Sequence, residues 1–145
     1  ISDSAWVLCL DDIKDPGNLG TIIRIADWYG ITSIYASSET VDLYNPKTIA
    51  STMGSFTRVH VTYTNLLEVC ESSKKQVFFT QMAGESIYTL PKHKEGIIVV
   101  GNEANGISDA LLSTKHIDIT IPKTGGAESL NAGVATAIVC DRLLR

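Results

Sequence analysis

Residues 121–145 read IPKTGGAESLNAGVATAIVCDRLLR and join a loop-forming half to a helix-forming half. A proline, two adjacent glycines and the triplet Ser129-Leu130-Asn131 come first. Residues 132–140 follow, with no charged side chain and with alanines that favour a helix. A helix that is apolar on nearly every side is buried on nearly every side. We therefore expect a buried terminal helix, covered in part by a second copy of the chain, with a glycine-containing ligand loop at its start.

Upstream of this stretch, short apolar segments alternate with helical patterns. Strands are expected at 5–10, 33–36, 59–63, 77–81, 97–100 and 117–121, and helices at 19–30, 46–53, 65–75, 109–112 and from 132 onwards. This alternation predicts an α/β fold, with a mainly parallel sheet and helices on both faces. The chain of 145 residues is long enough for one such domain, spanning 1–145.

Composition narrows the class of protein. Apolar residues make up 44% and charged residues 19% of the chain, which is typical of a globular domain. Three cysteines lie far apart in apolar runs, so we expect buried free thiols and a reducing, cytoplasmic setting. The three histidines are equally scattered, and no metal site is expected. The net charge of −4 argues against tight nucleic-acid binding by this chain alone.

Polar loops containing glycine follow the expected strands, at 15–20, 82–85, 101–106 and 122–131. Ligands of open α/β sheets bind beyond the carboxyl ends of the strands, so these loops predict a small-molecule site. Neither a G-x-G-x-x-G after the first strand nor a G-x-x-x-x-G-K-[ST] is present, which excludes the usual dinucleotide and P-loop sites. No serine lies in a G-x-S-x-G nucleophile motif.

Three ordered motifs resemble a known family. They are Asn18-x-Gly20-x-x-x-Arg24-x-Ala26, then Gly101-Asn102-Glu103-x-x-Gly106-Ile107-Ser108, then Pro122-x-x-Gly125-x-x-x-Ser129-Leu130-Asn131-x-x-x-Ala135. Together they closely resemble the motifs of the SpoU-type (TrmH-like, SPOUT superfamily) RNA 2′-O-ribose methyltransferases. The resemblance covers nearly the whole chain, in the right order, and departs from it at Ala104, where the family often has glycine.

The resemblance implies a fold, a cofactor and partners. It implies a carboxyl-terminal segment threaded through a loop as a deep trefoil knot, which sequence periodicity would not predict. It implies S-adenosyl-L-methionine, bent in the knot and held by the backbone of Gly84, Gly101, Asn102, Glu103, Ile121, Leu130 and Asn131. It also implies RNA (tRNA or rRNA) as substrate, a homodimer through the first and last helices, and no metal or membrane.

The implied reaction is in-line attack of a ribose 2′-hydroxyl on a sulfonium methyl. Arg24 is the family's catalytic arginine. A guanidinium stays protonated in proteins, so we interpret it as a fork for an RNA phosphate and the reacting hydroxyl, and not as a free base. Asn18, Glu103, Ser129 and Asn131 are expected to orient ribose and cofactor.

Simpler interpretations of the same residues stay open. Asn18 is a natural N-cap for the helix starting at 19, and Ser129 for the last helix. Arg24 could be a solvated helix residue, and Glu103 could only cap a turn. Asp11, Asp12 and Asp15 read as a solvated loop more readily than as a magnesium site. Trp6 and Trp28 read as core or interface residues more readily than as base-stacking platforms.

Two other functions compete with methyl transfer. One is a non-catalytic, RNA-associated dimeric module with the same fold, and the other is an α/β enzyme that uses a different nucleotide. The chain begins at Ile1 and not at Met, and its charge is acidic. We therefore expect a catalytic domain lacking an N-terminal RNA-binding region, which binds the cofactor but binds RNA weakly.

Overall fold

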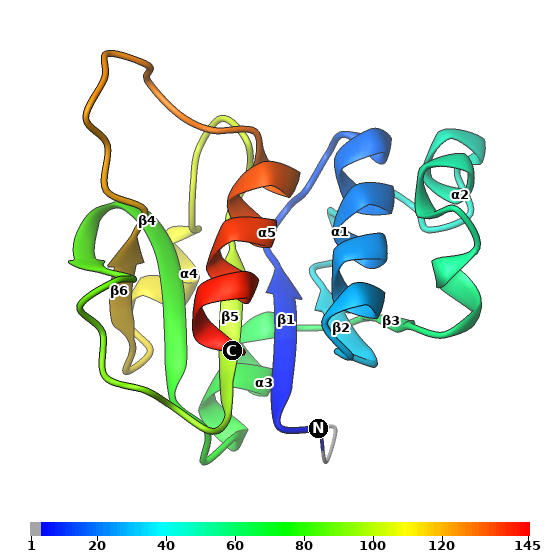
Figure 1. Ribbon diagram of the computed structural model, residues 1–145. Helices are drawn as coiled ribbons and strands as arrows, with labels where there is room; N and C mark the ends of the chain where they lie inside the picture. The colour runs from blue at the N-terminus through cyan, green and yellow to red at the C-terminus, as the bar shows by residue number, and fades with distance from the viewer. Residues whose placement is uncertain (1–3) are drawn as a thin grey trace.

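The computed structural model describes residues 4–145 and is built on one six-stranded parallel sheet (Figure 1). The strands are β1 (Trp6–Leu10), β2 (Ser33–Ala36), β3 (His60–Tyr63), β4 (Val77–Ser86), β5 (Gly96–Val100) and β6 (Ile117–Thr120). The helices are α1 (Pro16–Trp28), α2 (Pro46–Thr52), α3 (Leu66–Ser72), α4 (Asp109–Leu112) and α5 (Ala132–Leu143), with a 3₁₀ turn at Ser55–Thr57. The sheet order is β3-β2-β1-β5-β4-β6.

Helices cover both faces of the sheet, so the predicted α/β architecture is confirmed. On one face, α1 and α5 pack on the sheet and α2 lies beside α1, as Figure 1 shows. On the other face, α3 and α4 cover a second apolar cluster. Alternate residues of β1 divide between the two layers, with Leu8 in the first and Val7 and Cys9 in the second.

The two central strands define the place where a ligand site is expected. β1 and β5 pair in register from Trp6 opposite Gly96 to Leu10 opposite Val100, and both strands are buried along their length. From β1 the chain builds outward through β2 to β3, whereas β4 and β6 lie on the other side of β5. The order in which the chain adds strands therefore reverses between β1 and β5, and such a switch point is where open α/β sheets form their ligand crevice.

Two helix starts differ from the sequence prediction. α1 begins at Pro16, with the Asp15 side chain accepting the Gly17 N–H as N-cap, so the prediction of Asn18 as cap is wrong. A proline fits the first position of a helix, where no N–H is needed, and this moves the start upstream. α5 is capped by Asn131 and not by Ser129. Asn18 and Ser129 are therefore free for other roles.

The fourth strand also differs from its prediction, which ended it at residue 81 before a turn. β4 continues to Ser86 and re-pairs with β6 after a register shift between Thr80 and Glu85. Such a bulge bends a strand and re-aims its side chains. The bulged segment lies close to the last residues of β6, which makes it part of the same edge of the sheet.

The terminal helix α5 was predicted to be buried on nearly every side, but a single copy of the chain covers only its inner face. Its inner face, which includes Val139, Cys140 and Leu143, is buried, whereas Val134 is 50% exposed on the outer face. The cysteines are buried free thiols, as predicted. Between residues 4 and 145, none of the helices has the length and apolar character that a membrane span requires.

Candidate active site

The residues named by the sequence motifs meet at the carboxyl ends of β1 and β5. The chain leaves β1 through residues 11–15 into α1, and leaves β5 through residues 101–108. The segment 121–131 crosses from β6 to the start of α5 above the same edge (Figure 1). Three segments that are far apart in sequence thus converge where the strand order reverses, between β1 and β5.

Glu103 fastens the β5 loop to the start of α1. Its Oε1 accepts the Lys14 N–H at 3.1 Å, and its Oε2 accepts the Asp15 N–H at 3.0 Å. The same Oε2 accepts the side-chain amide of Asn18 at 3.1 Å. Three donors therefore surround one carboxylate, which is the arrangement expected for an ionised group.

Asn18 links this carboxylate to the last helix. Its carbonyl oxygen Oδ1 accepts the side-chain amide of Asn131 at 2.9 Å, while its own amide donates to Glu103. The Oδ1 of Asn131 in turn accepts the N–H groups of Gly133 and Val134 and caps α5. Glu103, Asn18 and Asn131 thus form one chain of hydrogen bonds through all three motifs, and we call it the motif chain.

The motif chain fixes the charge of its carboxylate. Burial by itself raises the pKa of Glu103, but the N–H groups of Asp15 and Lys14, its own backbone and the amide of Asn18 outweigh burial and lower the pKa. Glu103 is therefore ionised at neutral pH and already accepts three hydrogen bonds. A carboxylate in this state holds loops together and is poorly suited to remove a proton.

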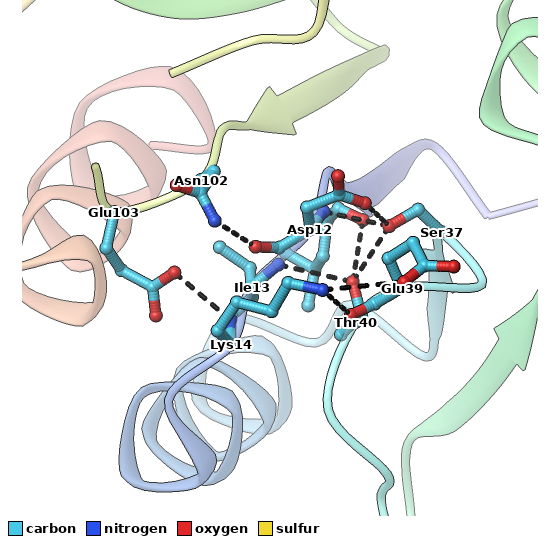
Figure 2. A network of polar contacts seen from close by, with 9 residues as sticks. Asp12, Ile13, Lys14, Ser37, Glu39, Thr40, Asn102 and Glu103 are labelled. Atoms are coloured by element: carbon cyan, nitrogen blue, oxygen red, sulfur yellow. Dashed lines mark hydrogen bonds and ion pairs between the residues drawn. The ribbon is translucent and has the colours of Figure 1, made fainter. Parts of the chain in front are cut away.

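A second polar network joins the turn after β1 to the loop after β2 and to Asn102, as Figure 2 shows. Asp12 adopts a left-handed conformation, with φ of 60°. Its N–H donates to Ser37 Oγ at 2.8 Å, its carboxylate accepts the Ser37 hydroxyl at 2.6 Å, and its carbonyl accepts the Asn102 amide at 2.6 Å. The loop after β2 thereby supports the turn that leads into α1.

Two glycines of the site are required by close packing. A Cβ at Gly101 would lie 2.4 Å from the carbonyl carbon of Gly106, because Asn102 and Gly106 pair across a tight loop. A Cβ at Gly84 would lie 2.6 Å from the carbonyl oxygen of Asp118 on β6, and Gly84 has φ of 158°. These loops therefore bring backbone groups to the carboxyl edge of the sheet without side chains in the way.

Of the remaining cofactor residues of the prediction, Ile121 directly follows β6, whereas Leu130 directly precedes the α5 cap Asn131. The Thr120 hydroxyl donates to the Met82 carbonyl at 3.2 Å, which holds the bulge of β4 against the end of β6, next to Ile121. Met82 and Leu130 are large exposed apolar side chains. This half of the edge offers apolar surface and free backbone, whereas the half at β1 and β5 offers hydrogen-bonding side chains.

Arg24 and Ser129 lie outside the motif chain. Arg24 is exposed on the outer face of α1, in one stripe with Thr21 and Trp28, and within residues 4–145 it makes no side-chain hydrogen bond or ion pair. Ser129 is exposed in the segment before α5. The structure therefore joins Asn18, Glu103 and Asn131, while the predicted roles of Arg24 and Ser129 toward RNA stay predictions.

Asp11 and Asp12 were expected in a solvated loop, which is wrong for Asp11 because it is only 4% exposed, and no sequence motif named Ser37 or Thr40. Thr40 and Asp11 are buried polar residues, and the Asp11 carboxylate accepts the Ser108 N–H at 2.6 Å. Ser37 and Thr40 lie in a stretch that read only as a polar loop. Their one sequence signal is position, since they directly follow the strand adjacent to β1. In the described part of the chain, no cluster of three or more His, Cys, Asp or Glu side chains could hold a metal ion.

Comparisons with known proteins agree with this geometry. The profile of the SpoU rRNA Methylase family matches residues 5–141. A 23S rRNA (guanosine(2553)-2′-O)-methyltransferase, RlmP, of Bacillus subtilis is 36% identical over 141 residues, covering 94% of this chain and 57% of that protein. A 23S rRNA (guanosine-2′-O-)-methyltransferase, RlmB, of Xanthomonas axonopodis is 32% identical over 97% of this chain and 59% of its own length.

A solved structure with bound cofactor has the same fold. The AdoMet-bound rRNA methyltransferase of Sinorhizobium meliloti superposes with a TM-score of 0.89 at 33% identity, covering 97% of this chain and 56% of that one. The chain thus spans little more than half the length of the relatives it matches.

Proposed function

The chain belongs to the SpoU rRNA methylase family, and we propose that it transfers the methyl group of S-adenosyl-L-methionine to a ribose 2′-hydroxyl of tRNA or rRNA. The observation that supports this most directly is the motif chain. It joins Asn18, Glu103 and Asn131, one from each family motif, at the point where the strand order reverses.

The residues at the edge of the sheet fit this cofactor. S-adenosyl-L-methionine carries an adenine ring and an amino acid but no phosphate, and the loops at 82–85, 101–106 and 121–131 offer glycines, backbone groups and exposed apolar side chains and contain only one basic residue, Lys123. We assign cofactor binding to Gly84, Gly101, Asn102, Glu103, Ile121, Leu130 and Asn131. The cofactor supplies an electrophilic methyl group on a positively charged sulfur.

The protein's own residues contribute position more than proton transfer. Glu103 is ionised and fully engaged, so its role is to hold the start of α1 against the cofactor loop. Asn18 and Asn131 fix each other's amide orientation, which leaves the α5 cap and the α1 start in one geometry. Correct alignment of reacting atoms supplies up to about 7–11 kcal/mol in the best intramolecular models.

Arg24 is assigned to the RNA. Its side chain is exposed and without a partner in the described chain, and a guanidinium binds phosphate through two parallel N–H groups. We propose that it holds a phosphate next to the target ribose and polarises the 2′-hydroxyl, with Ser129 orienting the sugar.

Two measurements test the function. Titration calorimetry with S-adenosylhomocysteine should show one site per chain, whereas an enzyme for another nucleotide should show none. Incubation with radiolabelled S-adenosyl-L-methionine and rRNA or tRNA, on protein extended to the relatives' full length, should place the methyl on a ribose. A chain that binds the cofactor product but labels no RNA would favour the non-catalytic module.

We further propose a homodimer through α1 and α5. The two helices lie side by side, with Gly133 packed against Thr21 and the Tyr29 hydroxyl donating to Asp141 at 2.9 Å. Their outer face presents Trp28, 79% exposed, and Val134 to solvent, beside a depression of about 620 Å³ that Ile138 helps to line. An uncovered apolar face of this kind marks an interaction site. Arg24 lies in the same exposed stripe of α1 as Trp28, so a second copy bound there would lie close to Arg24.

Sedimentation tests the dimer. Trp28→Glu should shift the chain toward monomer, because it places a charge in the apolar face, whereas Tyr44→Glu should not. Tyr44 is a suitable control because it is 74% exposed but lies before α2, away from α5. Equal sedimentation of wild type and Trp28→Glu, both as monomers, would contradict this interface.

The knot and the cellular setting are part of the same proposal. The chain ends β6 at an edge of the sheet and then returns to place α5 on the central strands, which is the path that a carboxyl-terminal trefoil knot requires. The buried free cysteines fit a reducing, cytoplasmic location. RNA binding by residues beyond this chain would account for its net charge of −4.

A further inference from the structure

The turn between β1 and α1 has a conformation that must be held in place. Asp12 has φ of 60°, a left-handed region that side chains other than glycine adopt at a cost, with aspartate and asparagine the most tolerant. Lys14 and Asp15, which donate their N–H groups to Glu103, follow directly. The direction of this turn therefore sets where the first residues of α1 meet the cofactor loop.

Thr40 bridges both ends of that turn. Its hydroxyl oxygen accepts the Ile13 N–H at 3.3 Å and its proton donates to the Leu10 carbonyl at 3.3 Å. The same oxygen lies 3.0 Å from Ser37 Oγ, which binds Asp12 (Figure 2). Thr40 is only 5% exposed, so water is a poor substitute for these bonds.

The loop at 101–106 is bonded to the same turn through the Asn102 amide and the Asp12 carbonyl, but it is also closed by bonds of its own. Asn102 and Gly106 exchange two backbone hydrogen bonds of 3.0 Å, and the Asn102 side chain accepts the N–H groups of Ala104 and Asn105. Loss of the Thr40 hydroxyl would therefore change the position of the first residues of α1 more than that of the loop at 101–106.

From this geometry we propose that Thr40 is a positioning residue for methyl transfer, acting through the 10–13 turn on Glu103, Asn18 and the helix that bears Arg24. Ser37 acts with it as a second support of the same turn. The inference rests on the proposed function, but the placement of Glu103 by Thr40 can be measured without any turnover.

The test compares one substitution at two buried threonines. Thr40→Val removes the bridging hydroxyl and keeps the side-chain shape, and Thr40→Ser restores the hydroxyl. Thr48→Val is the matched control, because Thr48 is fully buried on α2 and its hydroxyl has no hydrogen-bond partner within residues 4–145. Each variant is examined by carbon-13 NMR titration of the Glu103 carboxyl, by calorimetry with S-adenosylhomocysteine, and by methyl transfer.

In Thr40→Val we expect the pKa of Glu103 to rise toward its ordinary value, because the Lys14 and Asp15 N–H groups no longer hold their places. The kcat should fall about tenfold to a hundredfold, the range that a misplacement of about 1 Å produces. The Kd for S-adenosylhomocysteine should stay within about twofold. Thr40→Ser should recover most of the rate, and Thr48→Val should match wild type throughout.

The outcomes separate the two proposals. Wild-type protein that transfers no methyl group would overturn the function, while a changed Glu103 titration in Thr40→Val would still support the positioning role. A Thr40→Val protein with wild-type kcat and an unchanged Glu103 titration would overturn the positioning role. If Thr40→Val does not fold, Ser37→Ala takes its place, with the same shift of Glu103 expected and the same null result counting against it.

Discussion

The two sides of the proposed site are held in different ways. Residues 11–18 are fixed by side-chain hydrogen bonds to three neighbouring segments, through Ser37, Glu103 and Asn131. The segment 122–130 is exposed along its length, and the described contacts within it include one side-chain bond, from Lys123 to the Ala127 carbonyl. The first side is preorganised by the protein, whereas the second is free to settle on a ligand. Substitutions should therefore be costly on the first side and cheap on the second until cofactor or RNA binds.

The difference between the two sides is tested most directly by replacing a glutamate on each side with glutamine. Glu103→Gln replaces a carboxylate that accepts three hydrogen bonds with an amide that presents N–H to one of the donors. We expect about 1–2 kcal/mol less stability, a modest figure because the group is partly exposed, and at least about a hundredfold lower kcat/KM. Urea unfolding and methyl-transfer kinetics provide both numbers.

Glu128→Gln is the control on the loose side. Glu128 is exposed in the segment before α5, and its side chain makes no hydrogen bond or ion pair with the described residues. A surface change of this kind costs within about 0.5 kcal/mol. If both glutamines destabilised the chain equally, the distinction between the two sides would be wrong.

Arg24 belongs to both sides of this comparison: its backbone lies in helix α1, whereas its exposed side chain makes no hydrogen bond or ion pair with the described residues. Arg24→Lys should leave stability within about 0.5 kcal/mol, since no described contact is lost. The kcat/KM for RNA should fall about tenfold to a hundredfold, because an ammonium cannot bind phosphate through two parallel N–H groups. Full turnover with unchanged RNA affinity would contradict the forked role.

The central elements of the fold and the motif residues could be predicted from the sequence. The buried strands β1 and β5 and the helix α1 follow from apolar periodicity, and the motifs named Asn18, Glu103 and Asn131. The caps of α1 and α5 were misplaced by a few residues, because Asp15 and Asn131 compete with Asn18 and Ser129 through equally suitable side chains.

The supporting network could not be predicted from residue type. Thr40 matters because β2 lies next to β1, and that adjacency places the loop after β2 beneath the turn at Asp12. Strand order is set by packing across the whole sheet and not by any local pattern. The extension of β4 beyond residue 81 was not predicted for the same reason, since the second half of this strand is held by pairing with β6.

A matched pair of glycines tests packing on the two sides. Gly101→Ala should destabilise the chain by about 1–3 kcal/mol, because the new Cβ would lie 2.4 Å from the backbone of Gly106. Gly125→Ala places a Cβ in open space and should be neutral or stabilise slightly, through the unfolded chain. Thermal unfolding measures both, and a destabilised Gly125→Ala would show that the segment before α5 is packed after all.

The smallest expected effect is a dependence on pH. The pKa of Glu103 is lowered on folding: burial opposes the charge, but the N–H groups of Asp15 and Lys14, its own backbone and the Asn18 amide outweigh burial. A depressed pKa contributes stability in full above the unfolded value of about 4.3, and this contribution is lost as the pH falls through the folded value. The stability gap between wild type and Glu103→Gln should thus be wide at pH 7 and narrower below about pH 4. Asp27, whose pKa is lowered by Arg58 and Ser55, titrates in both proteins and cancels from the difference. A gap that stayed constant in urea titrations at both pH values would mean that Glu103 gains nothing from its charge, and the motif chain would then be held by shape alone.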